Sequence, residues 1–387
     1  MNTIKSQESG QETINQIAPL TWLRAIAAFL VLVSHSIRAA EVKYFPGDNE
    51  PSLLILSLFD LGYFGVCLFL ALSGSTLTLS AHGRMMGLSS IPSFYFKRFM
   101  RIWPAFAISL TVYLIFILIF NRAYAGDQRE WVKDFVNTYE IKDVLRYLTL
   151  TYNVTGPSNL FNMAYWTLPI EFQYYLILPF SLLLMNGLRT TLLTPLVFGG
   201  TLWAIDHWVT IPFDRTEVFR LAYIFWGGVL MAALSKIFSF KGNSKYGLTL
   251  FLFSFSFLAL DESNLLPKEI HHLGLGDWGH YGFTALICVG IALYFEPHPI
   301  PSWARDSLDK LGEISYSIYL YHILCINCAV IIINTYGYSN PNQKLVYIII
   351  ISFALSYIMG ALGYRWVEKP SISLARKWLD KDMHNPP

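Results

Sequence analysis

The sequence predicts an all-α polytopic membrane protein with about ten transmembrane helices. Of its 387 residues, 54% are hydrophobic and only 14% are charged, whereas about 25% of the residues of a soluble domain are charged. The mean hydropathy is +0.43. Apolar windows of about twenty residues, long enough to cross a bilayer as a helix, recur along the chain. The chain has no dense basic cluster of the kind that binds nucleic acid.

Ten segments are apolar enough to be spans, and those at 191–208 and 246–261 are the weakest. The first segment follows a leader that is not basic, so we expect it to be retained rather than cleaved as a signal peptide. No repeat of 20–50 residues is visible, which excludes a solenoid. The expected spans are 19–37, 54–79, 103–120, 166–186, 191–208, 217–235, 246–261, 280–295, 311–334 and 345–366.

The distribution of Lys and Arg predicts the orientation. With ten spans, 16 basic residues lie on the side that both tails share and 11 lie on the opposite side. Because cytoplasmic loops carry the excess of Lys and Arg, both termini are expected to be cytoplasmic. The expected organisation is a cytoplasmic tail at 1–18, a transmembrane domain at 19–366 and a cytoplasmic tail at 367–387.

The first span carries two ionisable residues, Arg24 and His35. Eleven helical steps leave them about 20° apart around the helix and about 16 Å apart along it, so they share one face. Ionisable groups inside a membrane span are costly and indicate a functional site. The spacing suits a long, anionic, activated donor, with Arg24 near the cytoplasmic end and His35 near the outer end.

A second group of polar residues is expected beside Arg24 at the inner side. The second span brings Ser73 and Gly74 there, and the third opens with Arg98 and Arg101, one helical turn apart. The guanidinium fork suits phosphate oxygens. The alternative for the two arginines of the third span is ordinary anchoring at the positive-inside face.

Glu171, in the fourth span, is predicted to lie in the outer half of the membrane with His35. A carboxylate there needs a partner or a wet cavity, and a His–Glu pair would fix the imidazole tautomer and raise its basicity. The alternatives are that Glu171 only bonds another helix and that His35 is an interfacial polar residue. For His322, near mid-membrane in the ninth span, helix packing and catalytic support stay equally open.

The four cysteines and the other histidines do not predict a metal site. The four cysteines lie in apolar runs and are interpreted as small buried residues, including the Cys325–Cys328 C-x-x-C. Most other histidines are expected in solvated loops, at span ends or in a tail, and no pair has convincing metal-ligand spacing. These groups are Cys67, Cys288, Cys325 and Cys328, and His207, His271, His272, His280, His298 and His384.

Six motifs in order resemble those of the acyltransferase family 3 integral-membrane acyltransferases. They cover residues 20–370, and while each is loose alone, the ordered set is specific. Ser75 departs from the usual aromatic residue, which puts a donor-contacting role for position 75 in doubt. Phe172 departs from a second acid, which leaves Glu171 as the acid of its motif. The motifs are LRAIAAFLVLVSH, YFGVCLFLALSGSTL, FYFKRFMRIWP, YWTLPIEFQYYLILP, LGEISYSIYLYHI and YRWVEKP.

The resemblance implies acyl transfer from cytoplasmic acyl-CoA, most often acetyl-CoA, to an acceptor at the outer side. It implies that His35 is catalytic and that Arg24, Arg98 and Arg101 bind the donor or are essential. Many relatives carry an additional periplasmic esterase-like domain. This chain stops about twenty residues after its last span, so it is expected to work alone or with a separate partner.

The resulting hypothesis is an O-acyltransferase of the bacterial inner membrane that needs no metal. His35 would take a proton from a glycan or glycolipid hydroxyl while Glu171 orients the ring, and an acyl-histidine intermediate is a variant. Polysaccharide-assembly proteins are possible partners. The rivals are a transporter, which would show pseudo-repeated halves, and a non-catalytic scaffold of polysaccharide assembly. In the loop 121–165, Trp131, Tyr139, Tyr147 and Tyr152 are either sugar-stacking or ordinary interfacial aromatic residues.

Overall fold

The protein is described here by a computed structural model that covers most of the chain. Its regular structure in these ranges is helical, apart from one isolated bridge between Gly242 and Phe295, which confirms the predicted fold class. Within the ranges given next, side chains are described from residue 18 to residue 379, except at 207 and 341. The described ranges are 2–40, 60–81, 85, 87–123, 139–157, 160–209, 217–238, 241–262, 279–337 and 340–384.

The helices follow one another along the described ranges. They are α1 (Asn2–Ala39), α2 (Leu61–Ala81), η1 (Leu88–Ser90), α3 (Ile91–Ala123), α5 (Ile141–Leu148), α6 (Tyr152–Thr155), η2 (Met163–Trp166), α7 (Thr167–Leu184), α8 (Leu188–Trp208), α9 (Glu217–Arg220), α10 (Ala222–Ile237), α11 (Ser244–Glu262), α12 (Gly279–Tyr294), α13 (Ser302–Glu313), α14 (Ser315–Thr335), α15 (Pro341–Gly363), the π-helical turn η4 (Tyr364–Glu368) and α16 (Lys369–His384).

Eight helical segments in the described ranges are long and apolar enough to cross a membrane. They include eight of the ten predicted spans, and the predicted spans 246–261 and 280–295 fall on α11 and the shorter α12. The start of the predicted span 54–79 lies outside the described residues. The chain is therefore a multi-pass membrane protein, and ten spans stays a prediction.

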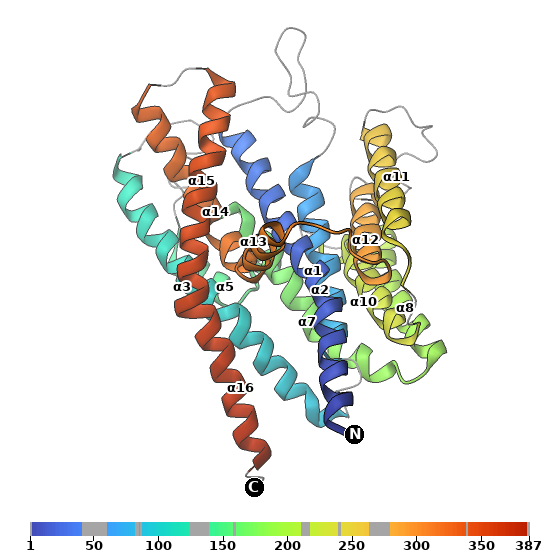
Figure 1. The fold of residues 1–387 in the computed structure, drawn as a ribbon. Coiled ribbons are helices and arrows are strands. Elements are labelled where there is room, and N and C mark those ends of the chain that lie inside the picture. The colour runs from blue at the N-terminus through green and yellow to red at the C-terminus, as the bar shows by residue number, and fades with distance from the viewer. Residues whose placement is uncertain are drawn as a thin grey trace.

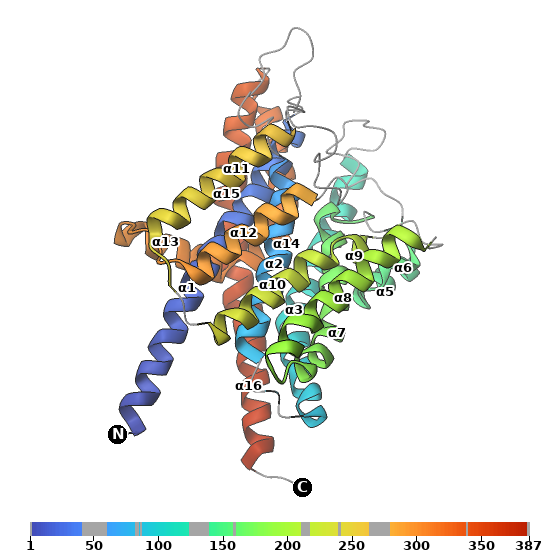
Figure 2. The same ribbon diagram turned by 90° about the vertical axis from the view of Figure 1, so that its right-hand side faces the viewer.

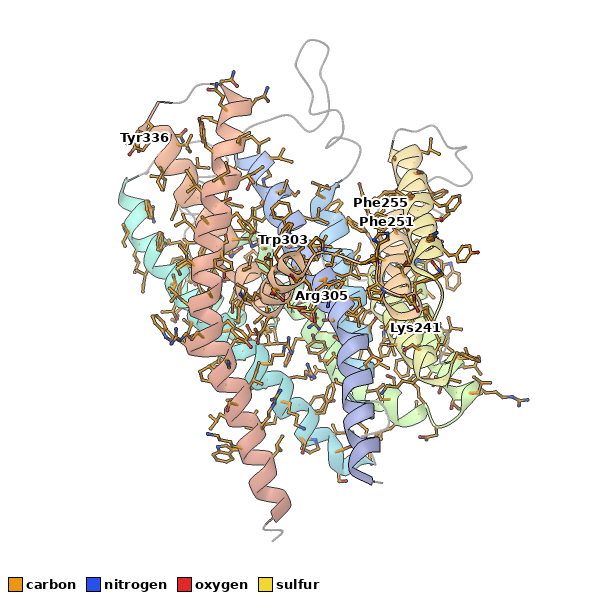
Figure 3. The ribbon with its side chains drawn as sticks, viewed as in Figure 1. Lys241, Phe251, Phe255, Trp303, Arg305 and Tyr336 are labelled. Atoms are coloured by element: carbon orange, nitrogen blue, oxygen red, sulfur yellow. The ribbon has the colours of Figure 1, made fainter. Side chains whose placement is uncertain are left out.

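Large apolar side chains lie exposed on the outside of the bundle. Leu118 of α3, Phe253 of α11 and Ile350 of α15 are 64%, 68% and 60% exposed. An exposed apolar surface of this kind is what lipid tails cover. Figure 3 shows the side chains that surround the bundle, with Phe251 and Tyr336 labelled.

The central helices α1, α2 and α7 lie between two groups of helices. Figure 1 places α8, α10, α11 and α12 on one side and α3, α14, α15 and α16 on the other. In both views α1 begins and α16 ends at the same end of the bundle (Figures 1 and 2), which we call the terminal end. That this end faces the cytoplasm stays a prediction.

Two glycines allow α2 and α10 to cross closely. A Cβ on Gly74 would collide with the carbonyl oxygen of Phe225, and one on Gly228 would collide with that of Ala71. Ser75 then reaches across, donating hydrogen bonds to the Ala71 and Gly228 carbonyls at 2.7 and 3.1 Å. Small residues at such a crossing bring two membrane helices into backbone contact. The crossing fixes α2, and with it the polar residues of its opposite face.

Part of the segment before α7 packs into the bundle. Tyr152, Phe161 and Tyr165 are fully buried, and the Asn162 side chain donates a 3.1 Å hydrogen bond to the Leu320 carbonyl of α14. The side of the membrane on which the described residues 139–157 and 160–165 lie stays a prediction. Tyr147 and Tyr152 stack on each other at 3.8 Å inside the protein, available neither to sugars nor to the membrane interface.

Helix α13 is a short amphipathic helix that the predicted span 311–334 partly included. It packs against α1, where Trp22 donates a 2.7 Å hydrogen bond to Asp309 and Gly312 lies against the backbone of Thr21. Figure 3 labels Trp303 and Arg305 on this helix, and both side chains are exposed. Such a polar helix suits a position at the membrane surface. Its end leads directly into α14 and the site described below.

Candidate active site

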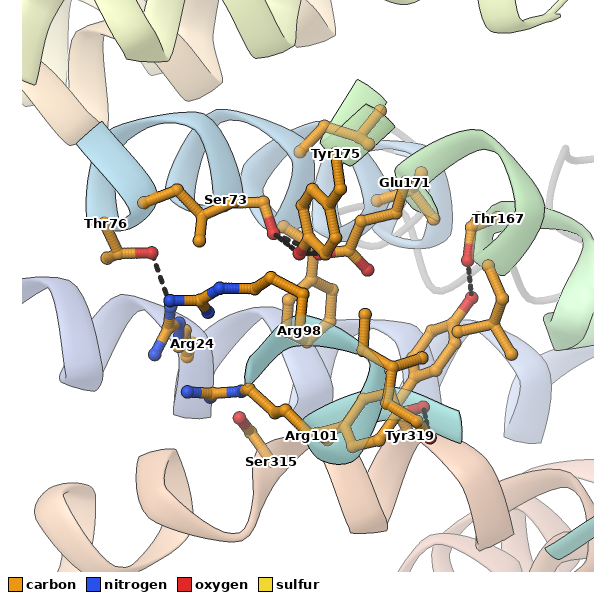
Figure 4. Close-up of a pocket in the computed structure, with 17 residues that line it drawn as sticks. Arg24, Ser73, Thr76, Arg98, Arg101, Thr167, Glu171, Tyr175, Ser315 and Tyr319 are labelled. Carbon is orange, nitrogen blue, oxygen red and sulfur yellow. Dashed lines mark hydrogen bonds between the residues drawn. The ribbon is translucent and has the colours of Figure 1, made fainter. Parts of the chain in front are cut away.

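One pocket gathers most of the residues that the sequence singled out. It encloses about 830 Å³ of empty space, part of it open to solvent, between α1, α2, α3, α7 and α14 (Figure 4). Polar groups and apolar side chains line it together. The lining residues are Arg24, Val66, Phe69, Leu70, Ser73, Thr76, Leu77, Arg98, Arg101, Ile102, Thr167, Leu168, Glu171, Tyr175, Ser315, Tyr316 and Tyr319.

Three guanidinium groups reach this pocket from two helices. Arg24 of α1 donates a 2.6 Å hydrogen bond to the Thr76 hydroxyl of α2. Arg98 of α3 has a buried Nε without a hydrogen-bond partner among the described residues. Figure 4 shows the side chains of Arg24, Arg98 and Arg101 pointing toward the same end of the pocket. The predicted convergence is confirmed for these arginines and Ser73, and donor binding stays a prediction.

Gly74 does not line the pocket. It faces α10 at the helix crossing described above, whereas its neighbour Ser73 faces the pocket. Adjacent residues of a helix point about 100° apart, which is why Ser73 and Gly74 face different neighbours. Gly74 positions α2 against α10, and its expected donor-binding role stays a prediction.

Glu171 belongs to the pocket and not to the surroundings of His35. Its carboxylate accepts short hydrogen bonds from the Ser73 and Tyr175 hydroxyls, and it interacts electrostatically with Arg24 and Arg98. The expected His35–Glu171 pair is therefore wrong. The reason is the buried segment before α7, which makes this helix begin within the bundle rather than at its outer surface.

Glu368 is a second acid near the arginines, and sequence reasoning did not identify it. It is 1% exposed, accepts a 3.0 Å hydrogen bond from the Ser317 hydroxyl, and interacts electrostatically with Arg101 and Arg24. It ends the π-helical turn η4 between α15 and α16, and such turns often occur at functional sites. The signal was its place in the YRWVEKP motif, which gave no partner for the carboxylate.

The imidazole ring of His35 lies beside that of His322. The ring centres are 5.3 Å apart, and the planes are tilted by 38°. His322 is buried and His35 is partly exposed. Helix packing and catalytic support were both open for His322, and its contact with His35 now connects it to the residue expected to be catalytic.

Tyr319 connects the pocket to the two histidines. It lines the pocket at the end away from the arginines (Figure 4), and its ring centre lies 5.5 Å from that of His322. Its hydroxyl donates to the Ala164 carbonyl at 2.6 Å and accepts from the Thr167 hydroxyl at 2.7 Å. The arrangement thus runs from three cations, through an apolar wall, to an imidazole pair.

The four cysteines, and the described histidines other than His35 and His322, lie outside the pocket. The four cysteines are free, three of them buried, as interpreted from the sequence. His280 is fully buried and paired with Asp261 at 3.1 Å, so the expectation of a solvated residue is wrong. His298 is exposed. The side chains of His207, His271, His272 and His384 lie outside the described residues. No cluster of three potential metal ligands occurs in the described part of the chain.

The sequence profile of the acyltransferase domain family (Acyl_transf_3) matches residues 17–365, which is most of the chain. The chain belongs to this family. The match includes both histidines, the three arginines and Glu171, and ends before Glu368.

Several relatives of this acyltransferase have names that specify the reaction. The O-acetyltransferase OatA of Staphylococcus aureus is 25% identical over 80% of this chain and 52% of its own length. ORF330 of Acidianus two-tailed virus, named as a candidate acetyltransferase, is 27% identical over 70% of this chain and 76% of its own. The chain thus spans about half the length of OatA. No solved structure matches it.

Family membership identifies the chain as a membrane-embedded O-acyltransferase enzyme. This result disfavours the two rivals, the transporter and the non-catalytic scaffold. The site holds three cations at one end of the pocket and an imidazole pair beyond the other, and α1 contributes Arg24 to the first and His35 to the second.

Proposed function

We propose that this acyltransferase moves an acyl group, acetyl above all, from cytoplasmic acyl-CoA to a hydroxyl of an extracytoplasmic glycan such as exopolysaccharide or lipopolysaccharide. The membrane would be the inner membrane of a bacterium. The single observation that carries the proposal is the gathering of three arginines in one pocket about 16 Å along α1 from His35.

Donor binding is supported by the charge and the unfilled donor groups of the pocket. Three guanidinium groups face one pocket-lining carboxylate, Glu171, so the pocket attracts anions. The unpartnered Nε of Arg98 would be satisfied by a phosphate oxygen of CoA, because guanidinium–phosphate hydrogen bonds are strong and directional. The pantetheine arm would then extend along α1 toward Tyr319, past Phe69 and Leu70.

The chemical step assigns the base to His35. A neutral imidazole takes the proton of the acceptor hydroxyl as its oxygen attacks the thioester carbonyl. The C–S bond breaks as the ester C–O bond forms, and the proton passes from His35 to the leaving sulfur, which gives CoA thiol. The partial exposure of His35 supports access for an acceptor from outside. An acyl-histidine intermediate is compatible with the same geometry.

Glu171 was expected to orient His35, but its contacts support a role in positioning the arginines of the pocket. Its hydrogen bonds with Ser73 and Tyr175 fix the carboxylate beside the arginines. There it holds the guanidinium groups in place, since a buried charge needs a counter-charge and satisfied hydrogen bonds. It is thus a positioning residue of the donor pocket.

Mass spectrometry of envelope glycans tests the proposal, with strains that have or lack the protein compared. The strain without it should lose an acyl ester, and the mass difference identifies acetyl, succinyl or a longer group. Complementation with the wild-type protein should restore the ester. Complementation with His35→Ala or Arg24→Ala should not restore it. Restoration by both variants, or glycans unchanged by loss of the protein, would reject the proposal. Co-purification would test for polysaccharide-assembly partners.

A further inference from the structure

His322 has one ring nitrogen fixed and the other free. Its Nδ1 lies 2.7 Å from the Tyr319 carbonyl oxygen. A carbonyl can only accept, so Nδ1 carries a proton and donates it. In the neutral ring Nε2 therefore has a lone pair. This atom is buried and has no hydrogen-bond partner among the described residues.

The imidazole of His35 lies beside the ring of His322 and carries an N–H that can donate a hydrogen bond. At a centre-to-centre distance of 5.3 Å, facing nitrogens of two imidazole rings would lie about 3 Å apart, which is hydrogen-bond distance. The hydrogen bond requires the His35 ring to turn so that its N–H faces Nε2 of His322. A buried acceptor left unpaired is costly, so this rotation is favoured energetically.

The hydrogen bond would determine the tautomer of His35. With one nitrogen donating to His322, the other must carry the lone pair, which is the state that a general base requires. No other described neighbour of His35 is seen to accept a hydrogen bond from its ring. Glu171 bonds Ser73 and Tyr175 instead. Arg38 interacts electrostatically with His35 but can only donate hydrogen bonds. When His35 takes the acceptor's proton, its other N–H strengthens the bond to His322.

We propose that His322 is a positioning residue that accepts a hydrogen bond from His35 and so holds His35 in the base-competent tautomer. This role presupposes the acyl transfer proposed above. The carbonyl of Tyr319 fixes His322, His322 fixes His35, and His35 alone touches the reacting hydroxyl. The same Tyr319 lines the donor pocket, so the backbone that fixes the histidines also borders the donor.

Two amide substitutions of His322 distinguish the proposed positioning role from a role in helix packing. In His322→Gln the side-chain carbonyl can take the place of Nε2 as an acceptor. In His322→Asn the shorter amide can reach only the place of Nδ1, where it can donate to Tyr319. If His322 positions His35, Gln supports turnover and Asn does not, whereas a packing role would treat both alike. His298→Gln, in an exposed segment, is the matched control.

The assay measures release of labelled acetate from acetyl-CoA by full-length protein in lipid nanodiscs, with water standing in for the acceptor hydroxyl. We expect His322→Asn to lower kcat about 10- to 100-fold with an unchanged KM for acetyl-CoA, a part of what a general base contributes. His322→Gln should stay within about threefold of the wild type. Equal kcat values for the two variants, whether high or low, would overturn the proposal.

A spectroscopic measurement does not depend on turnover. In ¹⁵N-histidine-labelled protein, assigned by difference with His322→Gln, Nε2 of His322 should show the shift of a hydrogen-bonded lone pair. In His35→Ala it should move to the value of a free lone pair. An Nε2 shift insensitive to His35→Ala would refute the hydrogen bond. Absence of acetate release by the wild type together with unchanged glycans would instead reject the proposed function.

Discussion

The donor pocket and the histidine pair lie along the same helix but are built in opposite ways. In the pocket, Arg24, Ser73 and Glu171 each have a polar partner, and several charges share one space. At the histidine pair, a single hydrogen bond, from His322 to the Tyr319 carbonyl, fixes the orientation of the His322 ring. In the proposed mechanism, donor binding is therefore distributed over many groups, and proton transfer depends on few. Substitutions in the pocket should act by degrees, and those at the histidines should be severe.

The largest expected effect separates the two regions directly. Loss of a general base costs about 10²- to 10⁴-fold in rate, so His35→Ala should nearly abolish acetate release from acetyl-CoA. It should still bind CoA, because the pocket is intact. Calorimetric binding and turnover of the same nanodisc preparation measure both quantities. Turnover by His35→Ala at the wild-type rate would exclude His35 from the chemistry.

Removing an arginine should weaken the donor complex and leave the histidines competent. Hydrogen bonds to charged groups contribute about 1.5–3 kcal/mol, so Arg98→Ala should raise the KM for acetyl-CoA about 10- to 100-fold. The adjacent exposed Lys97→Ala is the control and should change little. A variant of Arg98 with a lower kcat and an unaltered KM would contradict its place in donor binding.

Glu171→Gln decides to which region this acid belongs. The amide keeps an acceptor for Ser73 and Tyr175 but removes the charge that holds the arginines. Since the effect lies in the pocket, we expect the KM for acetyl-CoA to rise about 5- to 10-fold, with kcat changed less. Steady-state kinetics over a range of acetyl-CoA concentrations measure both. The reverse pattern would place Glu171 functionally with His35.

The smallest expected effect concerns one hydrogen bond, which Arg24 donates to a neutral hydroxyl rather than to the donor molecule. Thr76→Val removes the hydroxyl that accepts from Arg24 while preserving the shape of the side chain. A net hydrogen bond of about 1 kcal/mol corresponds to a rise in KM of about fivefold. Thr78→Val is the matched control, because Thr78 lies on the same helix and its hydroxyl donates to the Gly74 carbonyl, outside the pocket. Equal effects of the two substitutions would assign the loss to α2 rather than to Arg24.

The sequence predicted the helices and the arginine cluster because both follow from local periodicity. Spans follow from runs of apolar residues, and Arg24 was expected near Arg98 because both lie near the same predicted end of their spans. Glu171 was misplaced because its depth depended on where α7 begins. The aromatic segment before α7 is buried through long-range contacts such as Asn162 with Leu320, which no local pattern encodes.

Glu368 and His322 show the same limit. Glu368 interacts with Arg101 from a π-helical turn packed against α3, and neither the turn nor the partner follows from the spacing of the motif. His322 was visible as a costly polar residue, but its contact with His35 joins helices almost 290 residues apart in sequence. Tertiary packing decides both cases.

The part of α1 between Arg24 and His35 contains neither glycine nor proline and is continuous helix. Such a rod hardly changes its length or twist. During a reaction cycle, the distance between the cation and the imidazole is therefore constant. If the protein uses acyl-CoA as proposed, we expect opening of the pocket and release of CoA to come from movement of α2, α3, α7 or α14 relative to α1.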